Sequence, residues 1–251
     1  MEFNKNRYIG DIVLKRNPER DSYLNDIPAV KYLMDKGHIE LHSPVTFFIG
    51  ENGTGKSTLL EAIAVAAGFN PEGGTINFSF STRTTHSELC GCISLLRYGY
   101  PKDGFFLRAE SFYNVASNID ELDEAGGFGP QIKDSYGGRS LHAQSHGESF
   151  ISLVQNRFGG RGLYLLDEPE AALSPMRLMS LLMMMDGLVK MASQFIICTH
   201  SPILMAYPGA EIYQLSDAGI ERTDYKSTEH YIATRRFIDD PERMLKYLLE
   251  E

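Results

Sequence analysis

The feature that most constrains this chain is a glycine-rich segment, Gly50–Ser57, with the sequence GENGTGKS. It fits G-x-x-x-x-G-K-[ST], a pattern that requires a strand before it and a helix after it. Val45–Ile49 is a short apolar run typical of a buried strand, and Thr58–Ala67 is rich in Leu and Ala and stops at Gly68. Because both flanks fit, we interpret the segment as a phosphate-binding loop and not as a chance glycine-rich turn.

The chemistry of this loop comes from its backbone and from two side chains. Backbone N–H groups and the positive end of the following helix would face a triphosphate. Lys56 adds a positive charge near the β- and γ-phosphates, and the hydroxyl of Ser57 is a suitable ligand for Mg²⁺. The predicted nucleotide-binding residues are Gly50, Glu51, Asn52, Gly53, Thr54, Gly55, Lys56, Ser57 and Thr58.

Length and composition favour one domain. The 251 residues, 43% of them hydrophobic, suffice for a single α/β domain with a sizeable core. The chain has no apolar run of about 18 residues, and its start lacks the apolar core of a signal peptide, so we expect a cytoplasmic protein without direct membrane insertion. Three cysteines provide no disulfide framework, and a net charge of −9 argues against a broadly basic nucleic-acid surface.

Three further apolar runs predict the rest of the sheet. Phe105–Leu107, Leu163–Leu166 and Phe195–Thr199 are almost continuously apolar or aromatic, which is typical of strands buried on both faces of a parallel sheet. Ile212–Leu215 and Ile220–Thr223 flank a turn and predict a hairpin. Two short helices should follow the hairpin, and Pro241 should begin the second.

The segment Pro175–Ala192 predicts a helix that carries six of the ten methionines. Met176, Met179 and Met183 fall at the spacing of one helix face, which predicts a stripe facing the core. A methionine-rich groove for a partner is the alternative interpretation.

Two carboxylates follow the strand Leu163–Leu166 directly. This strand would deliver Asp167 and Glu168 to the carboxyl edge of the sheet, where ligands of α/β folds bind. Asp167 would hold Mg²⁺, and Glu168 would orient or deprotonate the attacking water. The alternative is a strand end with two solvated acids. His200 follows the next strand and could donate a hydrogen bond to a γ-phosphate.

Taken in order, these motifs resemble those of ABC-superfamily ATPases. Asp167-Glu168-Pro169 matches the D-E-P of that family, Ala171–Pro175 resembles its D-loop, and His200 resembles its switch histidine. The segment Ser145–Ser149, with the sequence SHGES, resembles the signature motif L-S-G-G-Q. Its Ser145 and Gly147 match, whereas His146 and Glu148 replace glycine and glutamine.

The differences from the family's motifs distinguish this chain from typical transporter subunits. The altered signature resembles the repair, chromosome-maintenance and stand-alone branches more than transporter subunits. The Q-loop glutamine of the family has no clear counterpart; Glu110 is a candidate for its position, where an acidic residue could still bind Mg²⁺ or a water. The whole chain most closely resembles small bacterial stand-alone proteins that are often labelled AAA family ATPases.

The resemblance implies a P-loop NTPase fold of ABC type. This is an α/β domain over residues 1–251 with a mixed, mostly parallel sheet flanked by helices. It would include a small helical and loop subdomain at about 111–158 that bears the signature, and C-terminal helices at about 224–251. We recognise no extra carboxylate cluster with a metal-site arrangement outside these motifs.

The resemblance also implies Mg-dependent hydrolysis of ATP between two copies of the chain. Lys56, Glu168 and His200 would be catalytic, and Mg²⁺ would be held by Ser57 and Asp167, with Glu110 as a further candidate. The signature of the second copy would contribute Ser145, His146, Gly147 and Glu148. The cycle would act on an unknown protein or nucleic-acid partner. The alternatives are a nucleotide-binding subunit of a membrane transporter and an ATP-sensing module with little hydrolysis.

Overall fold

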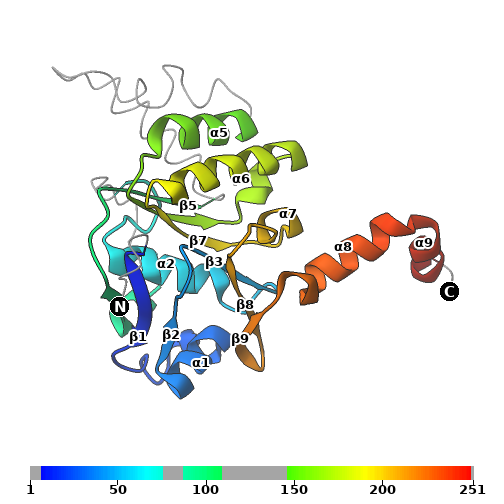
Figure 1. Cartoon of the computed structure of the whole chain (residues 1–251). Coiled ribbons are helices and arrows are strands. Elements are labelled where there is room, and N and C mark those ends of the chain that lie inside the picture. Colours follow the sequence, from blue (N-terminus) through cyan, green and yellow to red (C-terminus); the bar gives the residue numbers. More distant parts are fainter. Residues whose placement is uncertain (1–6, 76–86, 109–145, 250–251) are drawn as a thin grey trace.

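The centre of the molecule is a six-stranded sheet in the order β5-β6-β7-β3-β8-β9 (Figure 1). The computed structural model describes residues 7–75, 87–108 and 146–249. Every neighbouring pair of strands is parallel except β8 and β9, so the sheet is mixed and mostly parallel, as the sequence predicts. The strands are β3 (Val45–Gly50), β5 (Asp103–Arg108), β6 (Gly162–Asp167), β7 (Gln194–Cys198), β8 (Glu211–Ser216) and β9 (Gly219–Thr223).

The sheet is buried on both faces because successive side chains of its apolar strands point to opposite sides. Phe48, Leu165 and Ile196 belong to one hydrophobic core. Their neighbours Phe47, Leu166 and Ile197 belong to the other. Helix α2 (Lys56–Ala67) covers the first face, and the second is covered by α5 (His146–Arg157), α6 (Pro175–Lys190) and α7 (Pro202–Met205).

A small antiparallel sheet in the order β2-β1-β4 lies on the α2 side. Its strands are β1 (Ile9–Leu14), β2 (His38–Glu40) and β4 (Ile93–Arg97), and it is accompanied by α1 (Pro28–Lys36) and α3 (Leu89–Cys92). Gln194 joins the two sheets. Its buried side-chain oxygen accepts from the N–H groups of Tyr8 and Ile9, and its amide donates to the carbonyl of Ile9.

The predicted orientation of α6 is wrong. Met176, Met179 and Met183 are 71%, 48% and 77% exposed, whereas Leu178, Leu181, Met185 and Leu188 form the buried face. The helix carries apolar residues on most of its circumference, so two stripes have helical spacing, and the one that packs against the sheet is the leucine-rich one.

The chain ends in two helices, as predicted. After the short 3-10 turn at Tyr225–Ser227, Thr228 caps α8 (Glu229–Asp239) by accepting from the N–H of Tyr231, and α9 (Pro241–Leu249) begins at Pro241. Figure 1 shows the pair extending away from the sheet. Within the described ranges, no helix combines the length and apolar character needed to cross a bilayer.

The predicted subdomain at about 111–158 lies mostly outside the described residues, and only α5 belongs to the described part. All three cysteines are free, and Cys92 and Cys198 are buried.

Candidate nucleotide site

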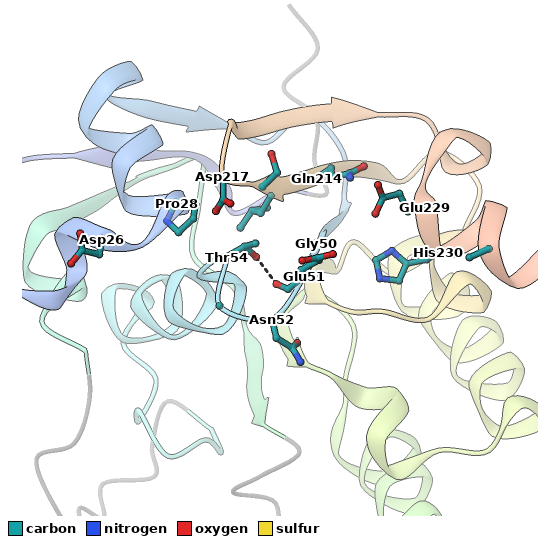
Figure 2. A pocket seen from close by; sticks show the side chains of 14 residues that line it. Asp26, Pro28, Gly50, Glu51, Asn52, Thr54, Gln214, Asp217, Glu229 and His230 are labelled. Atoms are coloured by element: carbon teal, nitrogen blue, oxygen red, sulfur yellow. Dashed lines mark hydrogen bonds between the residues drawn. The ribbon is translucent and has the colours of Figure 1, made fainter. Parts of the chain in front are cut away.

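The glycine-rich segment forms the connection between β3 and α2 that the sequence predicts. Gly50 has a φ of 140°, and a Cβ there would lie 2.2 Å from the carbonyl oxygen of Leu215, so only glycine fits. Gly55 has a φ of 95° and directly precedes α2. The hydroxyl of Thr54 donates to the carbonyl of Glu51 at 2.8 Å, which closes the loop (Figure 2). The hydrogen bond from Thr54 and the conformations of Gly50 and Gly55 therefore fix the shape of the loop just before the N-terminus of α2.

Lys56 is buried at the start of α2, with only 4% of its surface exposed. Its ammonium group donates to the carbonyls of Gly50 and Glu51 at 2.7 and 2.9 Å. Burial lowers the pKa of this lysine, and the nearby carboxylates, including Asp167 and Glu168, oppose that shift. The positive charge of Lys56 thus lies within the loop, where an oxygen of a bound phosphate would replace the carbonyl oxygens as hydrogen-bond acceptor.

Ser57 and Asp167 meet across the sheet edge. The hydroxyl of Ser57 donates to Oδ1 of Asp167 at 3.0 Å, and Asp167 is only 8% exposed. Two adjacent ligands of an octahedral Mg²⁺ lie about 3 Å apart at bond lengths of 2.0–2.1 Å, so this oxygen pair fits the ion. The two residues therefore form a suitable donor set for Mg²⁺.

Arg108 is a charged neighbour that the sequence analysis missed. It pairs in register with Asp167 at the end of β5, and its Nε lies 4.0 Å from Oδ2 of that residue. Its guanidinium also forms an ion pair with the buried Glu61 on α2. A charged residue directly after the apolar run Phe105–Leu107 was the signal that could have found it. Glu110, two residues further on, lies outside the described residues.

Glu168 has an unusual backbone conformation. Its φ and ψ are 48° and 53°, which is the left-handed region that non-glycine residues rarely adopt. Its N–H donates to the carbonyl of Cys198 at 3.0 Å, which ties the ends of β6 and β7 together. Strained residues of this kind cluster at functional sites. The carboxylate lies 3.6 Å from Nε2 of His200.

His200 is held from two sides. Its backbone N–H donates to the carboxylate of Glu170, and the ring atom Nδ1 lies 3.1 Å from Nε2 of His230. Burial and the charge of Lys56 lower the pKa of His200, while Glu168 opposes them. Burial, His200 and Lys56 likewise lower the pKa of His230. Both rings are therefore neutral near pH 7.

His230 is the second residue that sequence reasoning missed. It lies in the first turn of α8, thirty residues after His200, and nothing in the local pattern marks it. The two rings meet because the first turn of α8 lies beside the sheet edge, before the helix extends away from it. Its Nδ1 is buried and has no hydrogen-bond partner among the described residues.

Three of the four predicted signature residues lie at the start of α5. His146, Gly147 and Glu148 form its first turn, and Ser145 lies outside the described residues. Glu148 forms a 3.2 Å ion pair with Arg177 of α6. A Cβ on Gly147 would lie 2.9 Å from the carbonyl oxygen of Ala172, so the start of α5 is packed closely against the 3-10 turn Pro169–Ala172, called the D-loop turn below. Since α5 and α2 cover opposite faces of the sheet, the signature and the P-loop belong to different layers.

A cavity of about 680 Å³ lies beside the P-loop (Figure 2). Segment 50–54 of the loop forms one wall, and residues from the β8–β9 turn and from the start of α8 form others. Its charged and imidazole side chains are those of Asp26, Glu51, Asp217, Glu229 and His230. Lys56, Ser57 and Asp167 do not line it, so this acidic cavity adjoins the phosphate-binding loop without being the phosphate site itself.

Comparison with known proteins supports the P-loop assignment. A family described as an AAA domain matches residues 29–91, which include the whole loop and α2. The comparison with curated proteins gives no match.

Solved structures of ABC-type domains resemble the chain only distantly. An ATP-binding cassette of an ABC transporter is 16% identical, with 92% of this chain and 98% of that one covered and a TM-score of 0.48. The protein cbiO1 from Clostridium perfringens, part of the transporter complex cbiONQ, is 15% identical, with 98% of this chain and 100% of that one covered and a TM-score of 0.45. The SMC head domain from Thermotoga maritima is 15% identical, with 86% of this chain and 99% of that one covered and a TM-score of 0.44. Similarities this low carry no argument about function, which rests on the site itself.

Proposed function

We propose that this chain binds ATP with Mg²⁺ and hydrolyses it, and that the site is completed by a second copy of the chain. The observation that carries the proposal is the 3.0 Å pair of Ser57 and Asp167 beside the buried ammonium group of Lys56. A hydroxyl, a carboxylate and a lysine at the N-terminus of a helix are the groups that P-loop enzymes use to bind a triphosphate.

In this proposal, each group at the P-loop and at the end of β6 has a separate role. The N–H groups at the start of α2 and the ammonium of Lys56 stabilise negative charge on the phosphates, more strongly as that charge develops during transfer. Ser57 and Asp167 would hold Mg²⁺, which neutralises charge on the β- and γ-phosphate oxygens. Glu168 accepts a hydrogen bond from the attacking water and orients it toward the γ-phosphate.

His200 acts as a neutral donor to the γ-phosphate. A neutral imidazole carries one N–H, so donation from Nε2 requires that Nδ1 accept a hydrogen bond. Nε2 of His230 is 3.1 Å from that Nδ1 and supplies the N–H. This assignment leaves the buried Nδ1 of His230 as an acceptor and not as an unpaired donor, which agrees with its lack of a partner among the described residues. His230 is therefore a positioning residue that selects the useful tautomer of His200.

The separation of the two layers supports the proposed dimer. The start of α5 lies on the face of the sheet opposite α2, and its first turn offers N–H groups to an anion. In the proposed assembly, this turn and Ser145 contact the γ-phosphate bound to the P-loop of the other copy. The dimer would close on ATP and open after hydrolysis, so the nucleotide acts as a conformational switch.

The proposal is tested by titrating Mg²⁺ while phosphate release from ATP is measured. We expect saturable, Mg-dependent turnover that excess EDTA abolishes. Asp167→Asn and Ser57→Ala should require more Mg²⁺ for half-maximal turnover, whereas Ser180→Ala, on the exposed face of α6, should behave as wild type. Turnover that is unchanged in EDTA, or unchanged in both variants, would overturn the assignment of these ligands.

A further inference from the structure

A second group of candidate metal ligands lies on the small sheet, away from the P-loop motifs. Asp11 on β1 and Glu40 on β2 are direct partners in the antiparallel register, and Val13 pairs with His38. Residues two apart on a strand share a face, so the side chains of Asp11, His38 and Glu40 lie on the same side of the small sheet. The sequence analysis recognised no such cluster, because it exists only once β1 and β2 pair.

The distances within the cluster fit one small cation. One ligand atom from each of Asp11, His38 and Glu40 lies within 4.8 Å of the other two. Nε2 of His38 is 3.6 Å from one carboxylate oxygen of Glu40, and Nε2 of His42 is 3.3 Å from the other. Ligands of a tetrahedral zinc ion with bonds of 2.0–2.1 Å lie about 3.3–3.4 Å apart. Small side-chain rotations would therefore bring these atoms to a common ion.

The charges of the cluster are incompletely balanced without a cation. Asp11 and Glu40 are like charges directly opposite each other on neighbouring strands, an arrangement that destabilises a sheet. Oδ1 of Asp11 is shielded from water and has no hydrogen-bond partner among the described residues. A divalent ion would satisfy that oxygen and remove the repulsion between the two carboxylates. The side chains of His38, Glu40 and His42 are about half exposed, so an ion can enter from solvent.

We propose that Asp11, His38 and Glu40 bind a divalent transition-metal ion of the Zn²⁺ class, with His42 or water as the fourth ligand. Two imidazoles and two carboxylates favour such an ion over Mg²⁺, which prefers oxygen ligands only. The ion would fasten the three-residue edge strand β2 to β1. It would also brace the junction with β8, where the hydroxyl of Tyr213 donates to the carbonyl of Glu40 and the N–H of His42 donates to Glu211.

The test is isothermal titration of the full-length, chelator-treated chain with Zn²⁺, without nucleotide and in the presence of excess Mg²⁺. We expect one equivalent to bind. Asp11→Asn and His38→Asn should each weaken binding by about tenfold or more, as expected when a metal site loses a partner. Cys90→Ser should bind Zn²⁺ as wild type does, which separates this site from the nearby thiols. The visible spectrum of Co²⁺ bound in place of Zn²⁺ should change in the same two variants.

The control for folding is the melting temperature of each variant in EDTA, which should stay close to that of wild type. Zn²⁺ should raise the melting temperature of wild type and not that of Asp11→Asn. Absence of stoichiometric binding, or equal binding by wild type and both variants, would show that the cluster is an ordinary set of surface ion pairs. Neither result bears on ATP hydrolysis, so this proposal and the proposed function fail separately.

Discussion

The two halves of the proposed ATP site are built in different ways. The P-loop half (Gly50–Thr58 with Asp167 and Glu168) lies at the carboxyl ends of the parallel strands β3 and β6, which flank β7, and Ser57 already donates a hydrogen bond to Asp167. The described part of the proposed signature half, His146–Glu148, lies at the start of α5 on the opposite layer, where Gly147 packs against Ala172 and Glu148 pairs with Arg177 of α6. The difference teaches that sheet topology alone assembles the first half, whereas the proposal assigns the second half to the phosphate of another copy.

The largest effect should come from the centre of the P-loop half. Lys56→Ala removes the ammonium group that the carbonyls of Gly50 and Glu51 hold within the loop, and ATP hydrolysis should fall by about 10³-fold with much weaker nucleotide binding. Binding is measured with a fluorescent ATP analogue and turnover by phosphate release. Lys190→Ala, at an exposed ion pair on α6, is the matched control and should retain both activities. Unchanged ATP affinity in Lys56→Ala would remove the basis of the comparison.

Glu168→Gln should separate binding from chemistry. The amide keeps the shape of the side chain but is a poor acceptor for the proton of the attacking water, so turnover should fall by about 10²–10⁴-fold while ATP still binds. Bound ATP should then accumulate, and size-exclusion chromatography should show a dimer with Mg-ATP and a monomer without it. Glu221→Gln, on an exposed position of β9, should behave as wild type. A variant that remains monomeric at every ATP concentration contradicts the two-copy site.

The signature half can be tested through its close packing. Gly147→Ala places a methyl group 2.9 Å from the carbonyl of Ala172, so α5 must shift relative to the D-loop turn. We expect at least tenfold slower hydrolysis and a loss of about 1–3 kcal/mol in the free energy of unfolding, with ATP binding by the P-loop half retained. Urea unfolding and nucleotide titration measure the two effects.

Gly187→Ala is the matched control because it adds a methyl group within α6 where no atom lies within 4 Å. It should leave hydrolysis unchanged and stabilise the protein by about 0.5–1 kcal/mol. If Gly147→Ala hydrolyses ATP as fast as Gly187→Ala does, the start of α5 is not part of the site.

The smallest effect concerns the two histidines. The pKa of each is lower in the folded chain than in the unfolded chain, so the unfolded chain binds protons first as the pH falls. Stability is therefore complete above the ordinary histidine pKa of about 6.5 and declines as the pH falls from there toward the lower folded-state values. The charged groups that face the rings are Lys56, Glu168, Glu170 and Glu229.

His230→Gln should lose stability less steeply with falling pH than wild type, because one of the two groups with a lowered pKa is gone. Its amide nitrogen can take the place of Nε2 of His230 and donate to His200, so turnover near pH 7 should exceed that of His230→Phe, which cannot donate. Urea unfolding between about pH 7 and pH 5 and parallel turnover assays measure both effects. Equal turnover in the two variants would show that His230 does not position His200.

Sequence reasoning predicted the P-loop half because its information is local. A strand, the glycine loop and a helix follow one another directly, and the helix begins at Lys56, two residues before the predicted start. Asp167 and Glu168 could be placed because parallel strands end at a common edge. Arg108 lies at that same edge and escaped notice because its partner Glu61 is on α2, which no local pattern reveals.

What sequence reasoning missed depends on contacts between distant segments. His230 reaches His200 only because α8 starts beside the sheet edge, and Asp11 meets Glu40 only because β1 and β2 pair in one register. The methionine stripe on α6 was assigned to the core because two apolar stripes of the same helix have the same spacing. Packing against the sheet chose between them, and a periodicity cannot make that choice.

The most direct test of the account is to mix two variants that are each defective in one half. Lys56→Ala keeps an intact signature, and Ser145→Arg keeps an intact P-loop while blocking the signature of the same chain. Neither variant alone should hydrolyse ATP, but a mixed dimer contains one site in which both halves are intact. After equal amounts are mixed, phosphate release should return to about a quarter of the wild-type rate, since half of the dimers are mixed and each has one working site of two. A mixture that stays as inactive as its components would contradict a site shared between two copies.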